Sequence, residues 1–168
     1  MNKTMIAATV LAVGSLMASA GGAAAASADW FTMTLSANIA KPAATAWKLV
    51  GGEDWCGIAK YLDVKSCHID KGKGEVGSLR TINGTILEIA VARTPLSYTY
   101  AQPEAKNFYH GTMAVVPVDA THSKLVYTLV WDQTATGDAK AQAAARDGRK
   151  TRFQAAVDKM AAHANAAK

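Results

Sequence analysis

The middle of the chain alternates apolar and polar residues, a pattern that predicts β-strands with one buried face. The alternation is clearest over residues 31–39, and similar segments follow, separated by Gly, Pro and Asn. The further strands are expected at residues 64–70, 78–82, 85–93, 96–101, 108–118 and 124–131. Asn83-Gly84 between two of them predicts a two-residue hairpin turn. The pattern therefore predicts an antiparallel sheet of about seven strands.

Helical periodicity replaces this alternation in three places. Two short helices are expected after the first strand, one opened by Lys41-Pro42 and one over residues 55–62. Residues 138–168 predict a long helix, which Asp138 would cap and which Gly148 should weaken or bend. Its apolar stripe consists of Phe153, Val157, Met160, Ala161 and Ala164. Because such a helix needs an apolar surface to lie on, we expect an α+β fold with a curved sheet wrapped around this helix.

The N-terminus has the pattern of a secretory signal peptide, with Lys3 before an apolar run at residues 5–17. That run is shorter than the ~20 residues that span a bilayer. Two A-x-A sites follow, and we expect cleavage after Ala28, with Ala20 and an uncleaved anchor as alternatives. The sequence thus predicts a signal peptide at residues 1–28 and one exported, periplasmic domain at residues 29–168, without a further membrane-spanning segment.

The net charge of +5 is concentrated in the C-terminal helix. Residues 29–137 carry ten basic and ten acidic residues, whereas residues 138–168 carry seven basic and three acidic ones. The centre of this excess is formed by Arg146, Arg149, Lys150 and Arg152. A charge run of this kind is usually a solvated face, but it could also dock an acidic protein or an anionic lipid. Nucleic acid is not expected, because no recognition motif accompanies the patch.

Cys56 and Cys67 are the two cysteines of the chain, and in an exported protein an even number favours a disulfide. The histidines are scattered and show no paired metal-ligand spacing. No Ser-His-Asp order, phosphate-binding loop or paired carboxylate motif is present. We therefore assign no catalytic residue, metal or cofactor from the sequence.

Three charged residues, Lys65, Arg80 and Glu88, stand on expected strands that are otherwise apolar. Because a buried charge is costly unless it is paired, they could face solvent, pair with one another, or anchor a polar group of a ligand in a cavity. If Glu88 is such an anchor, Glu88→Gln should change binding and leave folding intact. Apolar candidates for the cavity lining are Tyr109, Met113, Tyr127, Trp131, Phe153 and Val157. The same side chains would also suit a filled core.

The order and spacing of several segments resemble the START-like, or Bet v 1-like (SRPBCC), superfamily, which includes polyketide cyclase/dehydrase and lipid-transport proteins. The matching segments are residues 39–47, 77–81, 85–88, 98–100 and 107–113. The resemblance covers essentially all of residues 30–165. It implies the helix-grip fold, in which the sheet and the C-terminal helix enclose an apolar cavity, but a shared fold does not fix a function.

Lys65-Ser66-Cys67 also resembles a run in plant abscisic-acid receptors, where the lysine meets the hormone's carboxylate. Those receptors have a pocket glutamate at the position of Glu88 and an Asn-Tyr pair near Asn107 and Tyr109. The resemblance implies a polar anchor at Lys65. Hormone reception is not implied, because the gate-loop sequences of the receptors are absent.

The resulting expectation is an exported binding or carrier protein for a small hydrophobic, lipid- or polyketide-like ligand. One alternative is a cyclase/dehydrase-type enzyme that moves protons through Glu88 with Tyr109 or Lys65. Another is a periplasmic accessory protein whose basic patch assists a dehydrogenase and cytochrome pair, as one exported member of the superfamily is thought to do.

Overall fold

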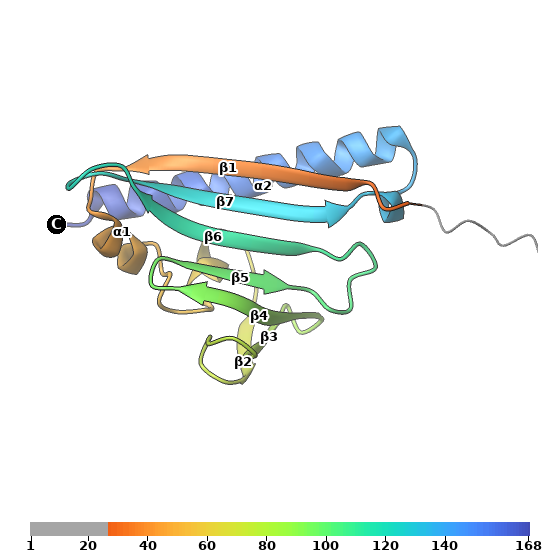
Figure 1. Ribbon diagram of the computed structural model, residues 1–168, viewed down its shortest axis with the longest axis horizontal. Coiled ribbons are helices and arrows are strands. Elements are labelled where there is room, and N and C mark those ends of the chain that lie inside the picture. The colour runs from red at the N-terminus through yellow and green to blue at the C-terminus, as the bar shows by residue number, and fades with distance from the viewer. Residues whose placement is uncertain (1–26) are drawn as a thin grey trace, which may run out of the picture.

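A computed structural model describes residues 27–168 and arranges them as a curved sheet with a long helix across its concave side (Figure 1). Residues 1–26, most of the expected signal peptide, lie outside the described residues. The seven strands are antiparallel and run in the order β1-β7-β6-β5-β4-β3-β2. The expected helix-grip fold is thereby confirmed.

The elements follow the expected order. The strands are β1 (Trp30–Ile39), β2 (Cys67–Lys71), β3 (Leu79–Ile82), β4 (Ile86–Thr94), β5 (Ser97–Ala101), β6 (His110–Pro117) and β7 (Ser123–Asp132). The helices are α1 (Ala43–Leu49), η1 (Gly57–Tyr61), η2 (Thr134–Thr136) and α2 (Ala139–Ala166), of which η1 and η2 are 3-10 turns. The second expected short helix is therefore real but shorter and more tightly wound than its sequence indicates.

The hairpin between β3 and β4 turns at Asn83 and Gly84, whose φ angles are +54° and +71°. Two positive φ values in a two-residue loop are those of a type I′ turn, as the Asn-Gly pair predicts. The Asn83 side chain also accepts hydrogen bonds from the backbone N–H of Lys65 (2.8 Å) and Ser66 (3.4 Å). Because these amides bond to the turn, β2 begins only at Cys67, and the strand expected from residue 64 is corrected.

Helix α2 begins where Asp138 accepts a hydrogen bond from the Ala141 N–H at 2.8 Å, and it continues through Gly148 to Ala166. Its buried residues are Phe153, Ala156, Val157, Met160, Ala161 and Ala164. The apolar stripe is confirmed, and it belongs entirely to the second half of the helix. The first half carries mainly small and basic residues. It therefore places no large apolar side chain against the sheet.

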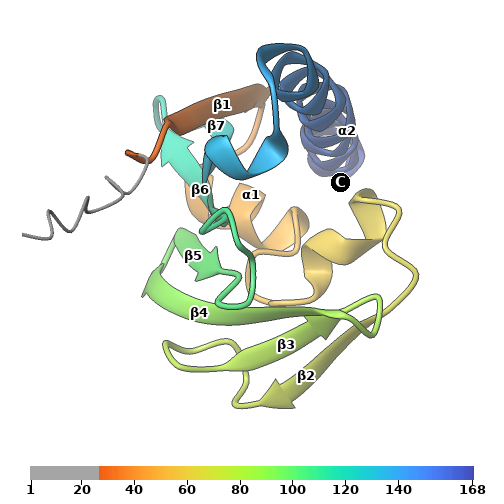
Figure 2. The ribbon, with the colours of Figure 1, turned by 90° about the vertical axis from the view of Figure 1, so that its right-hand side faces the viewer.

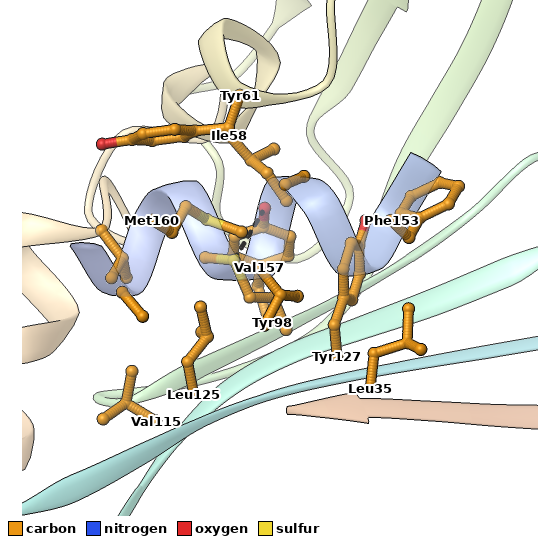
Figure 3. Close-up of a cluster of buried hydrophobic side chains, with 14 of the residues drawn as sticks. Leu35, Ile58, Tyr61, Tyr98, Val115, Leu125, Tyr127, Phe153, Val157 and Met160 are labelled. Carbon is orange, nitrogen blue, oxygen red and sulfur yellow. Dashed lines mark hydrogen bonds between the residues drawn. The ribbon is translucent and has the colours of Figure 1, made fainter. Parts of the chain in front are cut away.

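The core lies between the second half of α2 and the concave face of the sheet. Figure 3 shows Phe153, Val157 and Met160 on the helix facing Leu35, Leu125 and Tyr127 on the strands. Within the described residues, none of the helices combines the length and apolarity that a membrane crossing requires. No three His, Cys, Asp or Glu side chains gather as a metal site would need, again within residues 27–168.

Cys56 and Cys67 form a disulfide, as expected, with their Cα atoms 5.7 Å apart. The bond joins the residue before η1 to the first residue of β2. It closes the segment that carries Ile58, Ala59 and Leu62, which form one wall of the space described next.

Candidate ligand-binding cavity

A cavity of about 370 Å³ lies beneath the first half of α2, where the helix lacks large apolar side chains. The elements around it are α2, η1 with the segment that follows, the β3–β4 hairpin and the loop before β6, as can be followed in Figure 2. The apolar lining includes Ile58, Ala59, Leu62, Val64, Ile82 and Ile86, together with Ala145 and Phe153. Its volume lies within the range of small-molecule sites, roughly 300–1,000 Å³.

The sheet side of the cavity carries an ion pair between Arg80 and Glu88, which face each other across β3 and β4. Arg80 Nη2 lies 2.6 Å and Nε 2.8 Å from Glu88 Oε2. The other carboxylate oxygen, Oε1, accepts a hydrogen bond from Gln102 Nε2 at 3.0 Å. Both carboxylate oxygens are therefore already bound, and both charged side chains are almost completely buried.

The Arg80 guanidinium is also held by aromatic rings and a backbone carbonyl. Its central carbon lies 4.7 Å from the Trp55 ring centroid and 5.3 Å from that of Tyr100, and Nη1 donates to the Trp55 carbonyl. Burial alone would lower the pKa of Arg80, but Tyr98 and Glu88 outweigh it and raise that pKa above its usual value. Arg80 therefore stays protonated, and its charge is neutralised by Glu88.

Three tyrosines line the same space. The hydroxyls of Tyr100 and Tyr127 are 2.8 Å apart and hydrogen-bonded. The Tyr109 hydroxyl is buried and has no hydrogen-bond partner of acceptable geometry among the described residues. Burial raises the pKa of Tyr109 to about 12, although the neighbouring Tyr100 hydroxyl and, less strongly, Arg149 and Arg152 oppose the shift. At neutral pH the phenols therefore keep their protons and act as hydrogen-bond donors.

The α2 side of the cavity carries Arg149 and Arg152 next to Gly148. The Arg149 guanidinium carbon lies 4.7 Å from the Trp131 ring centroid and 5.9 Å from that of Tyr109. In the part of the chain that the structure describes, neither arginine forms an ion pair. The two cations therefore stand over the cavity without a carboxylate to neutralise them.

Five of the predicted lining residues line this cavity: Arg80, Glu88, Tyr109, Tyr127 and Phe153. The other three aromatic or apolar candidates, Met113, Trp131 and Val157, are fully buried in the core and are not among the lining residues. Lys65 is exposed and also outside the lining, because its segment is bonded to Asn83 rather than placed in β2. Whether any of these residues binds a ligand stays a prediction.

Sequence reasoning placed Arg149 and Arg152 only in a surface patch, and it left out Ile58 and Leu62. The spacing of these residues in the sequence could have indicated their positions. Arg149 precedes Phe153 by four residues, which places both on one face of α2, and Ile58 lies four residues before Leu62 in the segment expected to be helical. The residues of the basic patch at positions 146–152 have different surroundings in the structure. Arg146 lies over the Phe31 ring at 5.2 Å and donates to Gln133 Oε1 at 2.6 Å, while Lys150 is exposed.

The structure is similar in fold to several solved structures. A protein of Nitrosospira multiformis is 17% identical with a TM-score of 0.63, covering 80% of this chain and 97% of that one. The ZhuI aromatase/cyclase of Streptomyces sp. R1128 is 15% identical with a TM-score of 0.63, covering 81% and 94%. A norcoclaurine synthase of Thalictrum flavum, solved with a transition-state analogue, is 15% identical with a TM-score of 0.59, also covering 81% and 94%.

A search of curated protein sequences found no significant match. The sequence profile of one family, described as polyketide cyclase/dehydrase and lipid transport, matches residues 31–165. That match spans every strand from Phe31 onward and nearly all of α2. The helix-grip fold with its hydrophobic ligand-binding cavity is the architecture that the resemblance implied. The chain therefore belongs to the polyketide cyclase/dehydrase and lipid transport family, within the START-like, or Bet v 1-like, superfamily.

Proposed function

We propose that this protein is an exported carrier that binds a small hydrophobic ligand between α2 and the sheet. The observation that carries the proposal is the cavity of about 370 Å³ with its apolar lining from η1, β3, β4 and Phe153. Burial of an apolar molecule there would remove its surface from water, which contributes ~25 cal/mol per Å².

Export is supported by the signal-peptide pattern of residues 1–28 and by the Cys56–Cys67 disulfide. Disulfides persist in oxidising compartments such as the bacterial periplasm. A periplasmic carrier for an apolar molecule would need an internal cavity, because such a molecule is poorly soluble in the aqueous space.

Binding is favoured over proton-transfer catalysis by the state of the expected catalytic groups. Both oxygens of Glu88 are occupied by Arg80 and Gln102, so this carboxylate is not free to act as a general base. Lys65 is outside the cavity. A cyclase-type enzyme remains the second candidate, since the Tyr109 hydroxyl is buried at the cavity and unpaired within the described residues.

The accessory role has weaker support. Arg146 and Arg149 are half-buried, and only Lys150 and Arg152 of the four patch residues are exposed for an acidic protein partner. Two exposed cations form a small docking surface. A contact of this kind would be weak and strongly dependent on salt concentration.

The test is native mass spectrometry of the protein recovered from its own periplasm, followed by denaturing extraction of any retained molecule. We expect a bound apolar molecule. Ala145→Phe should displace it, because Ala145 lines the cavity. Ala144→Phe is the matched control, since Ala144 is exposed on the same half of α2 and outside the lining.

An empty protein that also fails to bind an environment-sensitive apolar dye would overturn the carrier proposal. Recovery of a chemically altered ligand after incubation, with loss of turnover in Tyr109→Phe, would favour the enzyme instead. Equal retention in the Ala145→Phe and Ala144→Phe variants would place binding outside this cavity.

A further inference from the structure

The charges around the cavity do not cancel. Three arginines, Arg80, Arg149 and Arg152, line it against the single carboxylate of Glu88, which leaves a net formal charge of +2. Arg80 and Glu88 neutralise each other through two contacts shorter than 3 Å. The excess positive charge is therefore located on the α2 side, at Arg149 and Arg152.

These two arginines share one face of α2, because they are three residues apart, and Phe153 continues that face into the core. The Arg149 guanidinium is held 4.7 Å from the Trp131 ring centroid, and that of Arg152 is 4.8 Å from the ring centroid of Phe153. A ring beneath the guanidinium plane leaves the N–H groups at its edge free to bond oxygen. Gly148 also lines the cavity, and a side chain there would meet no atom within 4 Å.

The phenol hydroxyls add further hydrogen-bond donors to the lining. Both oxygens of Glu88 are already bound by Arg80 and Gln102. The Tyr109 hydroxyl lacks a partner in the described structure, and the Tyr100–Tyr127 pair can use only one of its two protons internally. A neutral alkane-like ligand would leave these donors unsatisfied, which is unfavourable in a buried site.

We propose that the ligand is an amphipathic oxyanion whose apolar body lies between Ile58, Ile82 and Phe153 and whose carboxylate or phosphate group is bound by Arg149 and Arg152 at the α2 side. This inference rests on the proposed function and names the ligand class of the same cavity. Planar guanidinium groups bind both kinds of oxyanion through paired N–H donors. The anchor therefore lies on the helix, and the exposed Lys65 that the receptor resemblance suggested takes no part in it.

The test compares four probes with the same alkyl chain: dodecanoate, dodecyl phosphate, dodecanol and dodecyltrimethylammonium. Their binding to the purified protein is measured by isothermal titration calorimetry, below the critical micelle concentration of each charged probe and below the solubility limit of dodecanol. We expect one or both oxyanions to bind at least about tenfold more tightly than dodecanol, as charge-assisted hydrogen bonds do. The cationic probe should bind most weakly, and the ratio of the two oxyanions identifies the head group.

Arg149→Gln and Arg152→Gln should each weaken oxyanion binding by about tenfold and weaken dodecanol binding much less, so that the preference for the oxyanion is lost. Lys150→Gln is the matched control, because it removes the same charge from an exposed position outside the cavity lining. Arg149 packs on Trp131, so Arg149→Lys is added as a variant that keeps the charge and should retain part of the preference. Circular dichroism verifies the fold of each variant.

Two failures are distinguishable. If dodecanol binds as tightly as both oxyanions, or if Lys150→Gln weakens oxyanion binding as much as Arg149→Gln, the anionic ligand class is overturned while the cavity and its carrier role stand. If no probe binds and an apolar dye is not taken up either, the proposed function itself fails together with this inference.

Discussion

Individual polar side chains in this cavity differ in whether they have a partner. Glu88 has three hydrogen-bonding contacts, Tyr127 has one, and the Tyr109 hydroxyl has none among the described residues. A substitution that leaves a buried polar group without its hydrogen-bond partner lowers the stability more than the removal of a hydroxyl that has no partner. Substitutions of similar size at these positions should therefore have different effects on stability.

Glu88→Gln should lower the free energy of unfolding by about 3–5 kcal/mol, because it leaves the buried Arg80 charge without its carboxylate. From the sequence alone we expect this substitution to change binding and to leave folding intact, whereas the buried ion pair predicts a loss of stability. Urea unfolding of Glu88→Gln, Arg80→Met and the double variant Arg80→Met/Glu88→Leu checks it. The double variant should be the most stable of the three, and three equal losses would contradict a coupled pair.

Tyr127→Phe should destabilise the free protein by about 1 kcal/mol, since it removes the hydrogen bond to Tyr100. Tyr109→Phe should cost nothing or stabilise slightly, because the hydroxyl that it removes has no partner in the described residues. Thermal and urea unfolding of the two variants measure the difference. A larger loss in Tyr109→Phe than in Tyr127→Phe would mean that the Tyr109 hydroxyl has a bonding partner in solution.

At the scale of elements, α2 has two halves with different roles. The second half covers the sheet with its apolar stripe, whereas the first half, with Gly148, Arg149 and Arg152, covers the cavity. The opposite wall is the segment between Cys56 and Cys67, which includes η1. This wall consists of a 3-10 turn and irregular backbone, so its position depends on the disulfide and on the bonds to Asn83.

Removal of the disulfide should therefore affect both stability and binding. In the chain-entropy relation, a loop with a sequence separation of 11 contributes about 2–3 kcal/mol to the free energy of unfolding. Cys56→Ser/Cys67→Ser should lose about that amount and release a bound apolar dye faster, because Ile58 and Leu62 are less well held. Stopped-flow dye release, with unfolding in urea, measures both, and an unchanged release rate would show that η1 is held independently of the disulfide.

All five tyrosines of the chain are buried in one core, and for four of them this has a consequence for the behaviour of the protein in alkali. Burial raises the pKa of Tyr98 and of Tyr109 to about 12 and raises the pKa values of Tyr100 and Tyr127 well above 10. The unfolded chain would ionise these phenols near pH 10. The folded state thus holds protons that the unfolded state has already released.

We expect the protein to keep its full tyrosine-dependent stability below about pH 10 and to lose it progressively as the pH rises towards about 12. Phenolate absorbance and circular dichroism, recorded together during an alkaline titration, should change in one cooperative step for these four residues. Tyr109→Phe should make the loss of stability with pH shallower. Independent ionisation of the four phenols near pH 10, with the fold intact, would contradict their burial.

The architecture was predictable because its signals are local. Alternation identified all seven strands, Asn83-Gly84 identified the type I′ turn, and Asp138 identified the start of α2. Where a strand expectation failed, at residues 64–66, the cause was a side-chain contact with Asn83 from a distant part of the chain. Periodicity carries no information about such a contact.

The sequence by itself determined the fold class, the order of elements, the disulfide and the apolar stripe of α2, since each depends on residue type, spacing or the number of cysteines. Only the tertiary structure decided which side chains line the cavity. It paired Arg80 with Glu88, excluded Lys65, moved Trp131 and Val157 into the core, and placed Arg149 and Arg152 over the open space. These arrangements depend on how the first half of α2 and the segment around η1 are positioned relative to the sheet. That position is set by contacts between residues far apart in the chain, which no local pattern contains.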